Sequence, residues 1–259
     1  MPIREVFPNP TVRNVIFQIT FPNLFFMESK IGELQLRVMQ QFPKTALLFR
    51  RKVVFADVGP QGKLEELSKR FDEESAKKIW QFKAERNYAF SVTGDSLDIT
   101  SEFHKTYNLG ETDKFRDILK LVMDNFLAVT SIPILTRIGL RYVDECPLPS
   151  KDNETLRTYY NSAFPIRRFN IANAVEMLFR TVTEKGDLNL IYMETLTKPK
   201  DDYKLILDFD GFATNVPAQD YLRVTDRLHE LISKAYERTI KEPVYEYMRQ
   251  RRANNGQES

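Results

Sequence analysis

The middle of the chain reads LTRIGLRYVD at residues 135–144, and this run decides the fold class. Ile138, Leu140 and Tyr142 fall on one face of the run, whereas Arg137 and Arg141 fall on the other. Alternation with a period of two predicts a β-strand with one buried face. Such a strand favours an antiparallel sheet that is covered on one side and open on the other.

Further runs of the same kind lie on both sides of this strand. They occupy residues 15–21, 45–57, 80–82, 88–92, 97–99, 175–183, 188–197 and 203–210. Apolar residues at steps of three and four predict helices at 24–42, 64–71, 114–129 and 155–164 and a long helix after Pro217. The sequence therefore predicts an α+β fold, in which an extended curved antiparallel sheet carries long helices packed on one face.

The 259 residues are expected to form a single domain, 1–259, with 250–259 as a disordered tail. Residues 10–131 and 132–249 each run strand, helix, several antiparallel strands, helix. This order suggests two duplicated halves, although no residue-level repeat relates them.

The composition indicates a folded protein rich in strands. It is 42% hydrophobic, 12% aromatic and 29% charged, and 19 Phe and 11 Tyr stand against nine Gly. The formal net charge of +2 is well below the clustered positive charge of a dedicated nucleic-acid-binding domain. We therefore expect no nucleic-acid partner.

The cysteine content and the hydropathy pattern favour a cytoplasmic protein without a membrane segment. Cys146 is the one cysteine, so an intramolecular disulfide is excluded. Residues 1–7 lack the pattern of a secretory signal, and no apolar run approaches the ~20 residues that cross a bilayer. Cys146 itself precedes a proline without nearby basic residues, which favours a quiet buried thiol over a nucleophile.

Two segments carry a resemblance to a known family. They are RIGLRYV at 137–143 and the helix that contains Asp226, Leu228, His229, Ile232, Tyr236, Ile240 and Met248. Together they resemble a sporadically distributed, functionally uncharacterised bacterial protein family of about this length, and the resemblance spans most of the chain. It implies a bacterial accessory or mobile-element protein and carries over no catalytic residue. One position departs from the family pattern, because Asp144 stands where that pattern tends to place Asn.

The two arginines of the central strand are the first candidate binding residues. Arg137 and Arg141 share a face, with Gly139 between them leaving room for a close approach. The planar fork of arginine suits bidentate recognition of phosphate or another anion. Alternatively, both arginines pair with carboxylates of neighbouring strands, for which Asp208, Asp210 and Glu194 are available.

Asp208 and Asp210 also share a face of their own strand, and such a pair can hold a divalent cation through its oxygens. The competing interpretation is that Asp210-Gly211 forms the turn that ends the strand. We expect no metal and no cofactor.

Only His104 and His229 are available to a histidine-based catalytic triad. Asp226 precedes His229 by three residues on the long helix, a spacing that permits a hydrogen bond. A histidine that packs on the helix face is the alternative.

No nucleophile, base and orienting group converge in the sequence, so we expect a non-enzymatic binding or protein-interaction domain, with a partner protein or a second copy as its ligand. The alternative is an enzyme or nucleotide-binding protein that acts on a phosphorylated, anionic ligand. That ligand would be held by Arg137, Arg141, Asp208 and Asp210.

Overall fold

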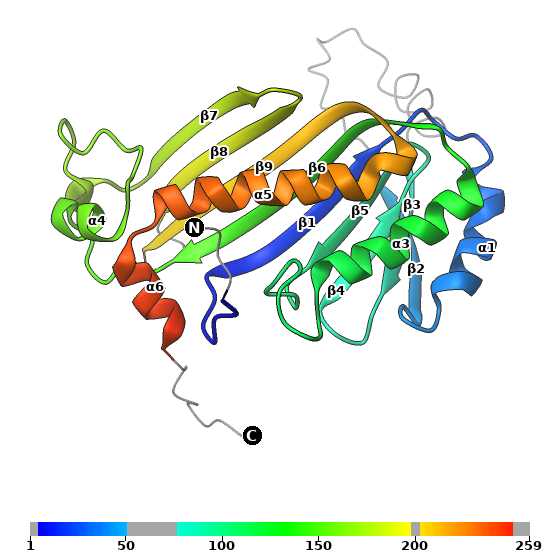
Figure 1. Ribbon diagram of the computed structural model, residues 1–259, viewed down its shortest axis with the longest axis horizontal. Coiled ribbons are helices and arrows are strands. Elements are labelled where there is room, and N and C mark those ends of the chain that lie inside the picture. The colour runs from blue at the N-terminus through cyan, green and yellow to red at the C-terminus, as the bar shows by residue number, and fades with distance from the viewer. Residues whose placement is uncertain (1–4, 51–76, 198–202, 251–259) are drawn as a thin grey trace, which may run out of the picture.

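The computed structural model describes residues 5–50, 77–197 and 203–250 and contains one antiparallel sheet. The nine described strands follow the order β2-β3-β4-β5-β1-β6-β9-β8-β7 (Figure 1). They are β1 (Val12–Thr20), β2 (Lys44–Arg50), β3 (Lys77–Lys83), β4 (Tyr88–Val92), β5 (Ser96–Ser101), β6 (Ile134–Cys146), β7 (Met177–Lys185), β8 (Leu188–Thr197) and β9 (Lys204–Pro217). The helix predicted at 64–71, the end of the strand predicted at 45–57 and nearly all of the predicted tail lie outside the described residues.

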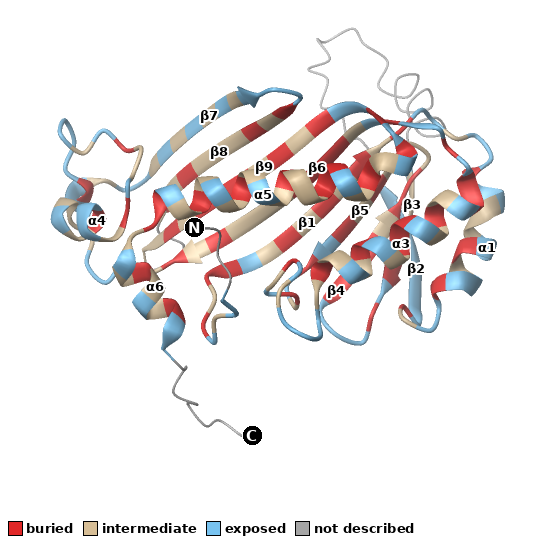
Figure 2. Cartoon of the chain, viewed as in Figure 1, coloured by how far each residue is buried: buried red, intermediate tan, exposed pale blue. Residues whose placement is uncertain are grey.

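The described helices lie on one face of the sheet. They are α1 (Met27–Val38), α3 (Phe115–Thr130), α4 (Asn153–Tyr159), α5 (Tyr221–Thr239) and α6 (Glu242–Arg249), with short 3-10 turns at Ile171–Asn173 and Ala218–Asp220. Figure 1 shows α3 and α5 running across the same side of the sheet, and Figure 2 shows buried strand positions beneath them. The predicted α+β fold with helices on one face is therefore confirmed. Within the described ranges, no helix is long and apolar enough to span a bilayer.

The two halves of the chain meet at the centre of the sheet, where β1 pairs with β6. Phe17 lies opposite Leu140 and Ile19 opposite Ile138, and all four side chains are fully buried. From this seam β5, β4, β3 and β2 extend to one side, and β9, β8 and β7 extend to the other. The predicted duplication of the two halves stays a prediction.

The strand β9 continues past the point where the sequence suggested a turn. Gly211 lies in the strand, not at its end, because Phe212 and Ala213 continue the alternation as far as Pro217. The turn predicted at Asp210-Gly211 is therefore wrong. A Cβ at Gly211 would lie 3.2 Å from the Ile232 side chain, so this glycine lets α5 pack closely on the sheet.

The helix predicted at 155–164 ends early, at Tyr159. Glu194 of β8 explains this end, because its carboxylate accepts hydrogen bonds from the Ser162 hydroxyl and from the Ala163 backbone N–H. Glu194 is fully buried on the helix side of the sheet, so it holds the chain after α4 in an extended path. It does not pair with the arginines of β6.

Candidate functional site

The open face of the sheet holds all four side chains that the sequence selected. Arg137 and Arg141 project from β6 on the side opposite the buried Ile138 and Leu140. Asp208 and Asp210 project from the adjacent β9 and contact the two arginines. The structure therefore brings the four residues together on one face, across two neighbouring strands.

Arg141 binds Asp208 through two parallel hydrogen bonds. Its Nε lies 2.8 Å and one terminal nitrogen 2.5 Å from the two carboxylate oxygens. In the strand register Arg141 lies opposite Asp210, so its side chain leans diagonally to reach Asp208. The hydrogen bonds to Asp208 raise the pKa of Arg141 further, and the guanidinium stays charged.

Arg137 reaches the other carboxylate by lying flat across the sheet. One terminal nitrogen is 3.1 and 2.9 Å from the two oxygens of Asp210. Its path crosses Gly139, where a Cβ would be only 2.5 Å from the guanidinium, and its charged group lies 4.8 Å from the Phe212 ring centre. Gly139 therefore admits the side chain of Arg137 itself, and Phe212 adds a cation–π contact.

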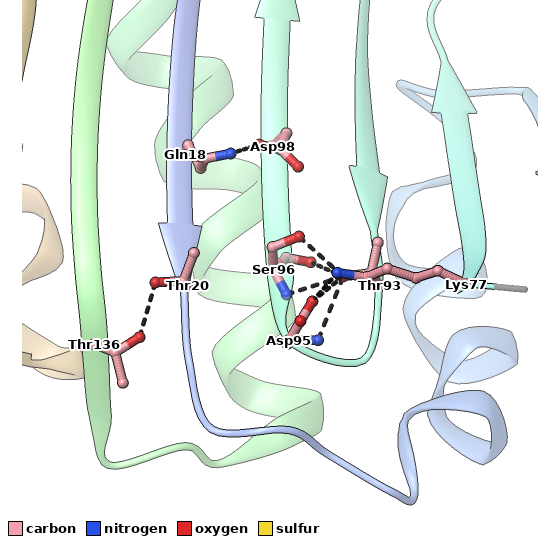
Figure 3. Close-up of polar contacts among 8 residues, drawn as sticks. All are labelled: Gln18, Thr20, Lys77, Thr93, Asp95, Ser96, Asp98 and Thr136. Carbon is pink, nitrogen blue, oxygen red and sulfur yellow. Dashed lines mark hydrogen bonds and ion pairs between the residues drawn. The ribbon is translucent and has the colours of Figure 1, made fainter. Parts of the chain in front are cut away.

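The network continues from Arg137 into the first half of the sheet. Arg137 also donates to Gln18 of β1 at 3.2 Å, and Gln18 donates to Asp98 of β5. Figure 3 shows the Gln18–Asp98 contact, with Thr20 and Thr136 bonded nearby across β1 and β6. Polar contacts thus link four neighbouring strands, from β5 to β9, on the face that the helices leave open.

This pairing limits what the open face can bind. Arg141 already uses Nε and one terminal nitrogen to bind Asp208, and Arg137 is shared between Asp210 and Gln18. Burial raises the pKa of Asp210, while the charge of Arg137 opposes that rise. An anionic ligand would meet guanidinium groups whose charge Asp208 and Asp210 already balance.

Asp208 and Asp210 are the pair that the sequence offered as ligands for a divalent cation. Among the residues that the structure describes, no three His, Cys, Asp or Glu side chains gather where they would hold a metal ion. Cys146 is buried, and burial raises the pKa of its thiol well above the ordinary value.

His104 serves to stabilise a turn. Its Nδ1 lies 2.8 Å from the Ser101 hydroxyl oxygen, which also accepts the backbone N–H groups of Phe103 and His104. Both side chains are buried, and burial lowers the pKa of His104 to about 4. The imidazole is neutral at pH 7, and the Ser101 hydroxyl acts as a local cap.

His229 uses partners other than Asp226. The Asp226 carboxylate accepts two hydrogen bonds from Arg116, at 2.8 and 2.9 Å, and one from Tyr107 at 2.7 Å. His229 instead lies 3.1 Å from the Tyr142 hydroxyl and 3.5 Å from the Ser233 hydroxyl. The pairing that the i, i+3 spacing permits is thus replaced by contacts to β6 and to the next turn of α5.

The outer edge of β7 is the second notable feature of the open face. This nine-residue strand pairs with β8 in an unbroken register, without a bulge or a proline, and is the last of the strands that the structure describes. Leu178 and Val182 are 63% and 48% exposed, and Arg180 and Glu184 beside them are exposed as well. The sequence predicted this strand but not its edge position, because the order of strands in a sheet follows from long-range pairing.

Comparison with known proteins adds no family to these observations. No family model matches the chain, and neither a curated protein nor a solved structure matches it. The resemblance to a bacterial family, carried by residues 137–143 and by α5, therefore stays a prediction.

Proposed function

We propose that the chain is a non-enzymatic interaction protein that acts as a homodimer, with two copies joined through the outer edges of β7. The observation that carries the proposal is the composition of this edge. An unpaired strand edge offers a row of backbone donors and acceptors to another strand, and β7 has neither a bulge nor a proline to prevent it. On the open face the edge presents two apolar residues and two opposite charges: Leu178, Arg180, Val182 and Glu184.

The charges select one register for the pair. A two-fold axis through Val182 sets Arg180 of each copy opposite Glu184 of the other, which gives two cross-strand ion pairs around a central valine pair. An axis through Thr181 sets Arg180 against Val182, and an axis through Arg180 sets two arginines against each other. Charge complementarity therefore favours the axis at Val182.

A disulfide trap tests this register directly. Residues directly opposite on antiparallel strands have Cα atoms about 4.5–5.5 Å apart, within the range that a disulfide spans. We expect Val182→Cys to cross-link two chains under mild oxidation. Leu178→Cys, on the same face but away from the axis, is the matched control. It should form no cross-link and run as a single chain on a denaturing, non-reducing gel. The buried Cys146 does not compete.

Charge exchange tests the same contact without a covalent bond. The interface is small, so we expect a concentration-dependent equilibrium that light scattering after size-exclusion chromatography can follow. Arg180→Glu should shift it toward monomer, and Arg180→Glu combined with Glu184→Arg should restore the dimer. A chain that is monomeric at all concentrations, or equal cross-linking of both cysteine variants, would overturn the proposal.

The alternative function, binding of a phosphorylated ligand, predicts a different result. A nucleotide with Mg²⁺ would raise the melting temperature by mass action, and Arg141→Ala would abolish that rise. This outcome would replace the interaction protein by a ligand-binding one. We further propose a cytoplasmic location, since the single cysteine, Cys146, excludes a stabilising intramolecular disulfide.

A further inference from the structure

A half-open cavity of about 130 Å³ lies on the helix side of the sheet, away from the arginine network and from β7. Five separate segments enclose it: the chain before β1, the loop after β5, the end of β6, the middle of α5 and the end of α6. Its wall is more apolar than polar. In Figure 1 the chain before β1, the end of β6 and α6 lie near one another, beside the half of α5 that leads into α6.

One carboxylate lines this cavity with a single hydrogen bond. Asp144 is 5% exposed, and its Oδ1 accepts from the Thr11 hydroxyl at 2.8 Å. No described residue donates to its Oδ2. In the described part of the chain, Asn14 Oδ1 is the side-chain polar atom that is fully buried and has no hydrogen-bond partner. Because Asp144 Oδ2 has no partner among the described residues either and is not in this class, it is not fully buried. The Oδ2 atom of Asp144 is therefore open to the cavity.

Lys105 is the positive charge that acts on Asp144, and its effect is smaller than that of burial. Lys105 lines the cavity but is exposed, and its ammonium donates to the Val12 carbonyl at 3.0 Å. Burial is the largest influence on Asp144 and raises its pKa to about 7, and repulsion from Asp208 outweighs attraction by Lys105. Water and solvent ions screen the exposed ammonium, and no ion pair joins Asp144 to another of the described residues.

Aromatic side chains form much of the remaining wall. Tyr107 stacks on His229 with ring centres 4.3 Å apart, and the Tyr142 ring centre lies 5.9 Å from that of His229. Tyr236 closes another side, and its hydroxyl is 2.6 Å from that of Thr11. Burial lowers the pKa of His229 to about 4, so the imidazole is neutral at pH 7 and supplies no positive charge to Asp144.

We infer that this cavity, which we call the Asp144 pocket, binds a small organic cation whose ammonium group pairs with Asp144 and whose body packs against Tyr107, Tyr142 and Tyr236. A buried carboxylate and aromatic faces are the two groups that attract an ammonium most strongly. The ligand supplies the counter-ion and donates to the oxygen that the fold leaves open. Anions are disfavoured because they would meet an unpaired carboxylate at close range.

The volume sets the size of the ligand. A cavity of about 150 Å³ accommodates one benzene ring. The Asp144 pocket, at about 130 Å³ and open on one side, therefore suits one ring or a compact alkyl group with an ammonium at its end. Benzylamine has this shape, and benzyl alcohol and benzoate are its neutral and anionic counterparts.

Calorimetric titration of the full chain with these three probes tests the inference. We expect benzylamine to bind at pH 8, benzyl alcohol to bind at least tenfold more weakly, and benzoate not to bind. Asp144→Asn keeps the acceptor for Thr11 but removes the charge, and it should weaken benzylamine by at least tenfold. Asp117→Asn, an exposed site on α3, makes the same charge change and should leave the affinity unchanged.

The pH dependence gives an independent readout of the same contact. The charged and titratable groups around Asp144 are Asp208, Lys105, Glu5, Tyr107, Tyr142, Cys146, Tyr236 and His229. The tyrosines, the thiol and His229 stay neutral between pH 6 and 8, whereas Asp144, with a pKa of about 7, changes charge in this interval. Since a proton competes with the ligand below pH 7, benzylamine should bind about tenfold more weakly at pH 6 than at pH 8.

Several outcomes would overturn the inference. They are equal affinity for benzylamine and benzyl alcohol, unchanged binding in Asp144→Asn, affinity that is the same at pH 6 and pH 8, or no binding of benzylamine at millimolar concentration. None of them bears on the β7 contact, because that strand lies outside the Asp144 pocket.

Discussion

Asp208 and Asp144 lie close together on neighbouring strands, are buried to nearly the same extent and differ in the face they occupy and in their partners. They are 6% and 5% exposed, and the strand register places Asp208 opposite Val143 and Asp144 opposite Leu207. Asp208 points to the open face and receives two hydrogen bonds from Arg141, whereas Asp144 points under α5 and receives one, from a neutral hydroxyl.

From this difference we take an unpaired buried carboxylate, and not a large number of charged residues, as the sign of a binding site. On the open face, Arg137 and Arg141 form ion pairs with Asp210 and Asp208, so the charges of these four residues are balanced. Two carboxylates line the Asp144 pocket: Glu5 binds Arg249, whereas Asp144 keeps an oxygen open. Burial without a counter-ion costs stability, so we expect the same substitution, Asp to Asn, to have opposite effects at the two positions.

The largest effect is expected at Asp144. Its pKa in the folded chain, about 7, lies above the ordinary value of 3.8, so folding takes up a proton between these values. Stability from this group is present below pH 4 and is lost as the pH rises through 7. Asp144→Asn should therefore raise the free energy of unfolding at pH 8 by up to about 4 kcal/mol, with little gain at pH 4. Urea denaturation at both pH values measures it, and a loss of stability at pH 8 would contradict the isolation of this carboxylate.

Asp208→Asn should act in the opposite direction. It removes the negative charge that pairs with the Arg141 guanidinium, and we expect the free energy of unfolding to fall by about 1–2 kcal/mol. The loss is limited because Arg141 is 41% exposed and screened by solvent. The double variant with Arg141→Met should recover part of the loss, since no unpaired guanidinium remains. Denaturation midpoints of the parent chain, Asp208→Asn, Arg141→Met and the double variant give the coupling between the two residues. Additive losses would show that the pair contributes nothing.

The smallest effect is expected at Gly139. A Cβ there would lie 2.5 Å from the Arg137 guanidinium, which must leave its path over the strand and loosen its contact with Asp210. Gly139→Ala should cost about 1 kcal/mol, because a flexible side-chain end moves and the backbone does not. In an Arg137→Ala background the same change should be neutral or stabilising, since alanine suits a strand better than glycine. A cost that persists in that background would place the strain in the backbone.

Local sequence patterns predicted much of the fold. The alternation around Arg137 and Arg141 predicted β6 and the face on which both lie, and it allowed pairing with Asp208 and Asp210. These features depend on residues close in sequence and on the period of a strand. The end of β9 was missed because Asp210-Gly211 has turn chemistry, and close packing of α5 determines the role of Gly211 instead.

The Asp144 pocket could not be predicted from the sequence, because five distant segments enclose it. Thr11 and Tyr236 are 225 positions apart and yet share a hydrogen bond. The sequence did contain one signal, Asp144, at a position of the strand that alternation assigns to the buried face beside Leu140 and Tyr142. A carboxylate at a predicted core position indicates either a buried partner or a ligand.

Titration of the Asp144 carboxyl carbon by NMR tests the central comparison most directly. The signal can be assigned by its absence in Asp144→Asn and followed in the free protein and with saturating benzylamine. A pKa near 7 in the free protein that falls when benzylamine binds is the predicted result. A pKa near 4 in the free protein would mean that Asp144 is already compensated and would contradict the account.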